Sequence, residues 1–500
     1  MARSSRMQGG AFAAIVMLFT GVAHAADENP FAATDKIFEE FQLDAHAPGL
    51  VYGIVEGGKL VHVKALGVQD LKERRPVTAD SLFRIASMTK VFTALTLLKL
   101  RDDGVVRLDA LAEDYVPELK GWKYPTADSP RIRVRDLLTH TGGFVTDDPW
   151  GDRQTPLPEN DFTMLLKTGV PFTRAPGMAY EYSNFGYALL GRIITNAGKR
   201  TYAEAVQATL LKPLGMSASG VMVASSPQEK RALPYRWEND AWSPEPDLGH
   251  GAFSSIGAMQ VSANDYAKWV AFLLSAWPPR DDADTGPVKR ASVRELAQGL
   301  SFVRTRPRPS RGAPGCVQPL TYSMGMNITV DCELGLNLSH GGGYPGYGSH
   351  MLIFPERGVG LFVFTNRTYA GPTAALWDAA VVLHKADHLG KTEPVALSAS
   401  LTAAYKVAGD VFKAGNIGIA GDTLAMNFLM DKSAENRAAD LAKLKAAVGD
   451  CDTGAAVTPT GALSGSFNWR CEHGRVRGNV LLSPDTPPRI QTLTFTLVTP

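Results

Sequence analysis

The amino-acid sequence predicts an α+β fold: an antiparallel sheet flanked by terminal helices, an inserted and mostly helical lobe, and a small C-terminal α+β domain. Strand signals occur at 49–68 and return at 349–366, which favours one sheet assembled from segments that are distant in the chain. The stretch between them contains short helical patterns broken by Pro and Gly. The length of 500 residues is also too great for one ordinary core, so we expect two domains.

The elements of the larger domain, 26–390, follow from hydrophobic periodicity. Phe31–Leu43 has the spacing of an amphipathic helix. The stretch 49–68 contains two apolar runs around Glu56-Gly57-Gly58, which is the pattern of a hairpin. Two further apolar runs within 349–366 flank a Pro-Glu-Arg-Gly turn, and a helical pattern follows at 372–390. We therefore expect terminal helices to pack on a sheet, with the helical lobe beside it.

The last part of the chain, 395–500, has a different character. Leu401–Val448 is Ala-rich with helical periodicity, and the segments 462–484 and 489–498 have the alternation of three strands. This order predicts a small accessory α+β domain, and it contains no catalytic constellation.

The N-terminus has the layout of a secretory signal peptide. Arg3 and Arg6 precede an apolar run at 11–22, and Ala23-His24-Ala25 resembles a cleavage site. The alternative is an uncleaved anchor, but the run is too short to span a bilayer comfortably. We expect residues 1–25 to be removed, with no lipoprotein cysteine at the new terminus and no later membrane span. The mature chain is then periplasmic or secreted.

Charge and cysteine content agree with export. The formal net charge is +1, so the chain lacks the excess of basic residues that would indicate a nucleic-acid partner. The four cysteines form two near pairs, Cys316 with Cys332 and Cys451 with Cys471, without the spacing of a zinc or redox motif. Two local disulfides are the prediction, each stabilising the fold by about 3 kcal/mol. The alternative is four reduced, buried thiols, which export disfavours.

Ser87 and Lys90 stand one turn apart at the head of a very apolar helix, in "SLFRIASMTKVFTALTLLKL" (81–100). Residues i and i+3 share a helix face, so the amine can reach the hydroxyl. The first turn of a helix also stabilises negative charge on a serine oxygen. Desolvation among apolar neighbours would lower the pKa of Lys90 and make it a proton acceptor. Taken alone, the motif is better explained by an N-capping serine and a solvated lysine than by catalysis.

Two further stretches strengthen the catalytic interpretation. Tyr182-Ser183-Asn184 offers a general base, if a nearby lysine lowers the tyrosine pKa, and an amide that can bind a substrate. His340-Gly341-Gly342-Gly343 precedes a predicted strand, where adjacent glycines let a substrate approach the backbone. The alternatives are an aromatic core residue beside a turn, and a flexible glycine loop.

Two look-alike motifs are set aside because both precede Tyr182. Lys167-Thr168-Gly169 ends a helical pattern, so Gly169 is better interpreted as a helix C-cap. His140-Thr141-Gly142 fits His-x-Gly, but it has the wrong place in the order of motifs.

The three motifs, in this order, resemble the serine β-lactamase and D,D-peptidase superfamily. The resemblance extends over about residues 30–388 and is closest to the class C-like branch, with its β-lactamases, D-alanyl-D-alanine carboxypeptidases, D-aminopeptidases and β-lactamase-like esterases. It implies the β-lactamase/transpeptidase-like fold and hydrolysis through an acyl-enzyme, without metal or cofactor. Its substrates would be small esters, amides or peptides.

The resemblance also implies roles for individual residues. Ser87 would be the nucleophile, and Lys90 and Tyr182 would share the work of the general base. Asn184 would hold the amide-like group of the substrate, beside His340, Gly341 and Gly342. The backbone N–H groups of Ser87 and Gly343 would form the oxyanion hole.

One departure affects the substrate. The family often carries Lys-Thr-Gly where this chain has His340-Gly341-Gly342, and that lysine and threonine help bind a substrate carboxylate. A histidine is only partly charged near neutral pH, and Gly341 has no hydroxyl. We therefore expect an esterase, amidase or aminopeptidase-like activity, with a β-lactamase or a D-alanyl-D-alanine carboxypeptidase as alternatives. A non-catalytic protein that binds cell-wall fragments is the alternative from another class.

Overall fold

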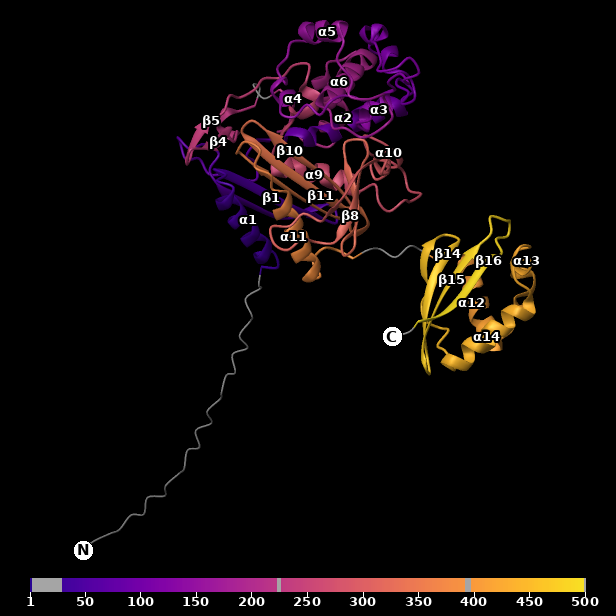
Figure 1. Cartoon of the computed structure of the whole chain (residues 1–500). Helices are drawn as coiled ribbons and strands as arrows, with labels where there is room; N and C mark the ends of the chain where they lie inside the picture. Colours follow the sequence, from indigo (N-terminus) through magenta and orange to yellow (C-terminus); the bar gives the residue numbers. More distant parts are fainter. Residues whose placement is uncertain (2–28, 223–225, 392–396, 499–500) are drawn as a thin grey trace. The chain divides into compact units, whose positions relative to one another are not determined.

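The computed structural model describes Met1 and residues 29–222, 226–391 and 397–498. The predicted signal peptide lies outside the described residues, apart from Met1. The chain divides into two compact units, Met1–Lys391 and Thr392–Pro500. Each unit has its own hydrophobic core, and Figure 1 shows unit 2 in orange to yellow.

Unit 1 is built on an eight-stranded antiparallel sheet with the order β2-β1-β12-β11-β10-β9-β8-β7. Its strands are β1 (Gly49–Glu56), β2 (Lys59–Gly67), β7 (Ser301–Pro307), β8 (Val317–Tyr322), β9 (Asn327–Asp331), β10 (Gly335–Tyr344), β11 (Tyr347–Phe354) and β12 (Val359–Thr365). Strand β1 pairs with β12, so the two predicted hairpins lie side by side although about 300 residues separate them. The prediction of one sheet from distant segments is confirmed.

Helices cover both faces of this sheet. On one face lie α1 (Ala32–Asp44) and α11 (Thr373–Lys385), which are the predicted terminal helices. Alternate residues of β1 point to opposite sides: Leu50, Tyr52 and Ile54 pack under these helices, whereas Val51 and Val55 face the other core. On that second face lie α2 (Thr89–Asp102) and α9 (Ala263–Leu274).

The remaining helices of unit 1 belong mostly to the inserted lobe, drawn in purple and magenta in Figure 1. They are α3 (Val134–Leu138), α4 (Trp150–Arg153), α5 (Glu159–Thr168), α6 (Asn184–Gly198), α7 (Tyr202–Val206), α8 (Ser254–Gly257) and α10 (Arg290–Glu295). Short strands β3 (Phe83–Arg84) with β6 (Gln260–Val261), and β4 (Tyr235–Glu238) with β5 (Ala241–Pro244), complete the unit.

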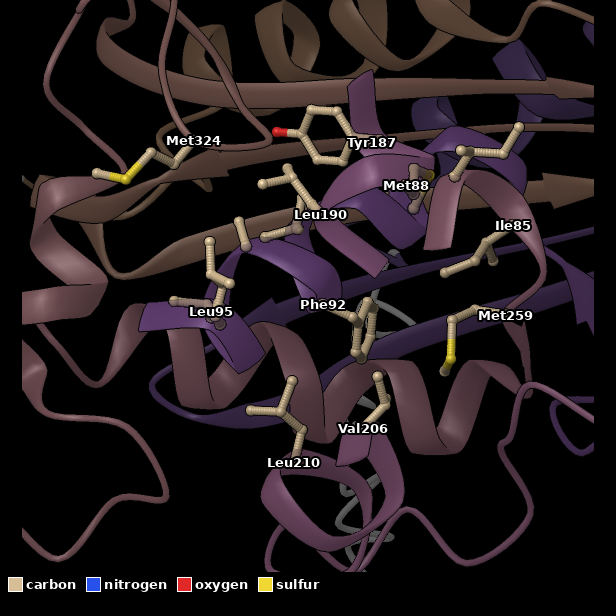
Figure 2. Packing of buried hydrophobic residues seen from close by; sticks show 14 of the residues in the cluster. Ile85, Met88, Phe92, Leu95, Tyr187, Leu190, Val206, Leu210, Met259 and Met324 are labelled. Atoms are coloured by element: carbon tan, nitrogen blue, oxygen red, sulfur yellow. The ribbon is translucent and has the colours of Figure 1, made fainter. Parts of the chain in front are cut away.

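Helix α2 is buried on every side, which explains its nearly continuous apolar sequence. All ten residues from Thr89 to Leu98 are buried. Figure 2 shows Phe92 and Leu95 of this helix among residues from several other segments, including Leu190, Val206 and Met259. Such packing fixes the start of the helix firmly, because a well-packed core tolerates little displacement.

Unit 2 contains α12 (Ala399–Ala414), α13 (Phe428–Asp431) and α14 (Ala434–Val448), followed by a four-stranded antiparallel sheet. Its strands are β13 (Thr458–Gly461), β14 (Ser464–Cys471), β15 (Gly474–Leu482) and β16 (Ile490–Val498). Phe412, Phe467 and Trp469 lie at the centre of its core. The predicted α+β class is confirmed, with β13 as a strand that the sequence did not indicate.

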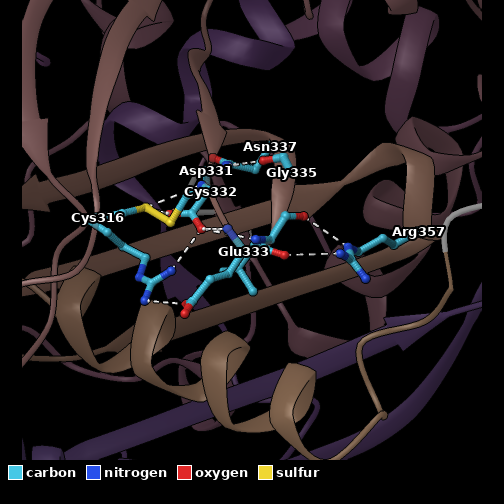
Figure 3. The surroundings of a disulfide bond; sticks show 9 residues. Cys316, Asp331, Cys332, Glu333, Gly335, Asn337 and Arg357 are labelled. Atoms are coloured by element: carbon cyan, nitrogen blue, oxygen red, sulfur yellow. Dashed lines mark hydrogen bonds and ion pairs between the residues drawn. A yellow bond between two sulfur atoms is a disulfide. The ribbon is translucent and has the colours of Figure 1, made fainter. Parts of the chain in front are cut away.

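The cysteines pair as the spacing predicts, Cys316 with Cys332 and Cys451 with Cys471. Figure 3 shows the first pair beside the turn that joins β9 to β10. There Asp331 Oδ1 accepts hydrogen bonds from Arg308 Nη1 at 2.8 Å and from the backbone N–H of Glu333 at 2.9 Å. The disulfide and this network together fasten the start of β10.

Among the described residues, no helix combines the length and the apolar character that crossing a bilayer requires.

Candidate active site

Ser87 lies in a one-turn 3₁₀ segment, Ala86–Met88, that leads directly into α2. Ala86 has φ +50°, a left-handed conformation that is costly for a residue with a side chain. The turn places Ser87 at the wall of a cleft of about 550 Å³. A strained residue next to a serine that lines a cleft, held by a fully packed helix, is typical of a functional site.

Lys90 is completely buried and makes three hydrogen bonds through its amine. Nζ lies 3.0 Å from Ser87 Oγ, 2.8 Å from Asn184 Oδ1 and 3.1 Å from the carbonyl oxygen of Ile256. Burial lowers the pKa of Lys90 to about 8, although carboxylates at 147, 148 and 152 oppose that shift. The amine is therefore partly neutral near physiological pH and can accept a proton from Ser87.

Tyr182 lies on the other side of the amine, with its ring centroid 4.9 Å from Lys90 Nζ. A hydrogen bond connects its side chain with Ser87, yet burial raises the pKa of Tyr182 well above 10. The expectation that a nearby lysine lowers this pKa is therefore wrong. The phenol stays protonated and can donate a hydrogen bond or relay a proton.

The Tyr182-Ser183-Asn184 segment is held by caps at the start of α6. Ser183 Oγ accepts a hydrogen bond from the N–H of Gly186 at 3.1 Å. The carboxylate of Asp147 accepts from the N–H groups of Asn184 at 2.6 Å and Phe185 at 2.7 Å. These contacts fix the position of the tyrosine beside the lysine.

Strand β10 forms the opposite wall. It pairs with β9 only as far as Ser339, so the edge beyond that residue faces the Ala86–Met88 turn instead of another strand. A Cβ on Gly342 would lie 2.3 Å from the carbonyl oxygen of Ile85, and one on Gly343 would lie 2.5 Å from the ring of Tyr369. The glycines therefore let the strand approach the serine turn closely.

These features match known proteins. Residues 34–385 match the Beta-lactamase family, which is most of unit 1. The chain belongs to the Beta-lactamase family. Protein flp of Staphylococcus aureus (strain N315) is 28% identical over 337 residues, covering 66% of this chain and 62% of that protein. Penicillin-binding protein 4* of Bacillus subtilis (strain 168) is 24% identical over 325 residues, covering 62% of this chain and 66% of that protein. This chain thus spans somewhat less than two thirds of the length of these relatives.

Solved structures agree on the fold. A penicillin-binding protein homologue from Pyrococcus abyssi, described as octameric, has a TM-score of 0.60 at 19% identity and covers 94% of this chain and 96% of its own. A class C β-lactamase from Rhodobacter sphaeroides has a TM-score of 0.52 at 22% identity, covering 71% of this chain and 98% of its own. The first match must include part of unit 2, because 94% of the chain exceeds unit 1. The family match over residues 34–385, together with this fold, confirms the predicted superfamily.

Within this β-lactamase fold, most of the site residues singled out in the sequence line one cleft. Ser87, Tyr182, His340, Gly341 and Gly343 line it. Lys90 lies directly beneath Ser87.

Asn184 and Gly342, like Lys90, do not line the cleft. The side chain of Asn184 is buried between Lys90 Nζ and the carboxylate of Asp148, so it positions the lysine and is not free for a substrate. Gly342 contacts Ile85 and Ala86 of the chain itself. The close approach that its missing side chain permits is thus made by the protein backbone.

His340 differs from expectation in place and in charge. It lies inside β10, paired with Met351 of β11, and not at the mouth of a strand. Burial lowers its pKa to about 3, helped by the positive charge of Lys90. The ring is therefore neutral at physiological pH, and the partial charge expected from the sequence is absent. Its Nδ1 lies 2.6 Å from the carbonyl oxygen of Gly341, and Nε2 lies 3.3 Å from the hydroxyl of Tyr322.

Of the motifs set aside, one belongs to the site. Gly169 caps α5 with φ +82°, as interpreted from the sequence. His140, in contrast, packs its ring 4.4 Å from that of Tyr182, and its Nδ1 accepts a hydrogen bond from the N–H of Ser183 at 3.1 Å. Burial lowers its pKa well below 6.5, so it supports the tyrosine segment as a neutral ring.

Sequence analysis missed the wall of the cleft made by Asp148, Asp152 and Tyr369. Asp148 lies in the loop before α4 and Asp152 lies within that short helix. Tyr369 lies four residues after the end of β12, more than 200 positions from the two aspartates in the sequence, and lines the same cleft. Only the tertiary fold brings these three residues together.

Proposed function

We propose that this chain is an exported serine hydrolase that acts through an acyl-enzyme on Ser87, on small esters, amides or D-amino-acid peptides. The observation that carries this proposal is the 3.0 Å contact between Ser87 Oγ and the buried, partly neutral amine of Lys90. Membership of the Beta-lactamase family supports serine hydrolysis at the level of the superfamily.

In the first step, Ser87 Oγ attacks the substrate carbonyl carbon and forms the Oγ–C bond while its proton moves to Lys90 Nζ. The backbone N–H groups of Ser87 and Gly343 stabilise the oxyanion. The bond to the leaving group then breaks, and the leaving group takes up the proton through Lys90 and the hydroxyl of Tyr182. Water finally attacks the ester carbonyl, and Ser87 regains its proton. Lys90 is the primary base here, because the pKa of Tyr182 is far too high for that role.

The neutral state of His340 supports a preference for substrates without a carboxylate. In family members with Lys-Thr-Gly, a lysine stands at this position and helps to hold a carboxylate, whereas the pKa of His340 is only about 3. Without a fixed cation there, recognition of a carboxylated β-lactam loses a charge-assisted hydrogen bond. We therefore place ester or amide hydrolysis ahead of β-lactam hydrolysis.

The test combines labelling with turnover. A fluorophosphonate should label Ser87 in the purified protein, and Ser87→Ala should abolish both labelling and hydrolysis without changing the melting temperature. p-Nitrophenyl acetate, a chromogenic cephalosporin and D-alanine p-nitroanilide are compared by kcat/KM. Labelling of another serine would remove the nucleophile assignment, and absence of labelling and turnover would favour a non-catalytic binding protein. Efficient cephalosporin hydrolysis with negligible esterase activity would instead make the protein a β-lactamase.

A further inference from the structure

Two carboxylates stand on one wall of the catalytic cleft. Asp148 and Asp152 line it together with the hydroxyl-bearing ring of Tyr369, and no lysine or arginine is among the described residues that form its lining. The cleft therefore presents negative charge to a substrate. This polarity is opposite to that of a site built to receive a carboxylate.

Asp152 is the more unusual of the two, because it is only 3% exposed yet lacks a cationic partner. Its Oδ2 accepts a hydrogen bond from Tyr369 Oη at 3.0 Å. Among the described residues, neither an ion pair nor a second side-chain hydrogen bond reaches this carboxylate. Burial raises the pKa of Asp152 to about 7, and the charge of Asp148 adds to this shift, so the carboxylate is about half ionised at neutral pH and ionised above it. A cationic ligand beside it would offset the cost of its buried charge.

The nearest cations do not neutralise this wall. Lys90 lies beneath the cleft, and its amine is engaged by Ser87 and Asn184. Arg153 contacts Tyr369 Oη from outside, at 3.4 Å from Nη1, and forms no ion pair with Asp152 among the described contacts. Among the described side-chain contacts, Tyr369 occupies Oδ2 of Asp152 and Asn184 occupies Oδ1 of Asp148, so one oxygen of each carboxylate is left for a ligand.

Aromatic rings line the same space. Tyr180, Tyr182 and Tyr322 face the cleft together with Tyr369. Aromatic faces attract organic cations, with the greatest effect where water is excluded. Carboxylates and tyrosine rings around one cavity are the combination that recognises an ammonium group.

The wall formed by Asp148, Asp152 and Tyr369 adjoins the segment assigned to bind the substrate carbonyl. Tyr369 packs against Gly343, where a Cβ would lie 2.5 Å from its ring, and it hydrogen-bonds to Asp152. The carboxylate is therefore next to the strand segment assigned to the oxyanion hole. Asp148 is joined to Lys90 through the amide of Asn184.

We propose that Asp152 and Asp148 form a subsite for a cationic amine of the substrate, so that the preferred substrates are amides or esters whose acyl group carries an ammonium group near the scissile carbonyl. This inference rests on the proposed function and narrows its substrate class. Asp152 supplies the buried charge-assisted hydrogen bond, and Asp148 adds charge at the more exposed rim.

The test uses substrate pairs of equal shape that differ in charge. Alanine p-nitroanilide, as both enantiomers, is compared with isobutyryl p-nitroanilide, in which a methyl group replaces the ammonium group. We expect kcat/KM for the better alanine enantiomer to exceed that of the neutral analogue by about tenfold to a hundredfold, the scale of one charge-assisted hydrogen bond. In Asp152→Asn this ratio should fall to near one.

A matched control is Asp161→Asn, which removes an exposed carboxylate from α5, away from the cleft lining. Its ratio should equal that of the wild type. A second measurement, independent of turnover, is protection of Ser87 from the fluorophosphonate by alaninamide compared with isobutyramide. Protection should favour alaninamide in the wild type and not in Asp152→Asn.

The outcomes separate the two proposals. Labelled Ser87 and turnover of neutral esters, with no preference for the ammonium substrate in either assay, would overturn the amine subsite alone. A preference that survives in Asp152→Asn and in Asp148→Asn would also overturn it. Failure of labelling and turnover together would overturn the proposed function, and the subsite with it.

Discussion

The pH dependence of hydrolysis follows from the environment of Lys90. Its pKa of about 8 means that the neutral, proton-accepting amine is the minority form at neutral pH. From this value, about one hundredth of the lysine is neutral at pH 6, about one tenth at pH 7 and about nine tenths at pH 9. We expect kcat/KM for p-nitrophenyl acetate to rise about ninetyfold from pH 6 to pH 9, with a slope near one below pH 8.

The direction of the pH effect depends on which protonation state of Lys90 is active. The charged amine cannot accept the proton of Ser87, so activity increases as pH rises through the pKa of Lys90 and then levels off. The assay is initial-rate kinetics on the neutral ester, corrected for spontaneous hydrolysis at each pH. In Lys90→Ala the rate should fall by about a hundredfold or more, and the ascending limb of the pH profile, which ends near pH 8, should vanish.

Asp152→Asn offers a finer check of the same reasoning. The negative charge of Asp152 raises the pKa of Lys90, so its removal should move the ascending limb to lower pH. Lys167→Ala, on the exposed surface of α5, is the matched control and should leave the limb where it is. A limb that persists in Lys90→Ala would refute the assignment of this lysine as the base.

Three further changes test the construction of the site. Gly342→Ala places a Cβ 2.3 Å from the carbonyl oxygen of Ile85, so β10 or the serine turn must shift. We expect kcat/KM to fall at least tenfold, which corresponds to a loss of about 1.4 kcal/mol of transition-state stabilisation. An unchanged kcat/KM would show that this close approach is not critical. His340→Lys introduces a second ammonium near the catalytic lysine, which should lower the pKa of that lysine and move the ascending limb of the pH profile to lower pH; a limb displaced to higher pH would contradict this. Removing the first disulfide with Cys316→Ser and Cys332→Ser should lower the free energy of unfolding by about 3 kcal/mol, as measured by denaturant titration. A loss below about 0.5 kcal/mol would mean that the hydrogen bonds of Asp331 alone hold the turn.

The sequence was sufficient where local patterns decide structure. The hairpins predicted at 49–68 and 349–366 lie at 49–67 and 347–365 in the structure. These hairpins and the helix that carries Lys90 are predictable because apolar periodicity and turn residues are local properties. The spacing of Ser87 and Lys90 likewise fixed their proximity through helix geometry alone. Strands β7, β8 and β9 were missed because each has only five to seven residues, without a clear alternation of apolar and polar residues. Strand β10 was missed because its glycines have the composition of a loop.

The sequence was insufficient where tertiary contacts decide chemistry. His140 was set aside from its place in the motif order, yet the fold packs it against Tyr182, 42 positions later. The neutral state of His340 and the high pKa of Tyr182 both result from burial, which residue identity does not reveal. Asp152 and Tyr369 share a hydrogen bond across 217 positions, a pairing that no single-sequence pattern indicates.

The tight seam between β10 and the turn before α2 has an evolutionary consequence. The carbonyl oxygen of Ile85 lies so close to Gly342 that not even a methyl side chain would fit there. The geometry at Ser87 is therefore set by main-chain contacts, which few substitutions can alter. The adjoining wall, formed by Asp148, Asp152 and Tyr369, consists of side chains that can be exchanged one at a time. A lineage built in this way can adopt new substrates through single replacements in that wall while its chemistry is inherited unchanged.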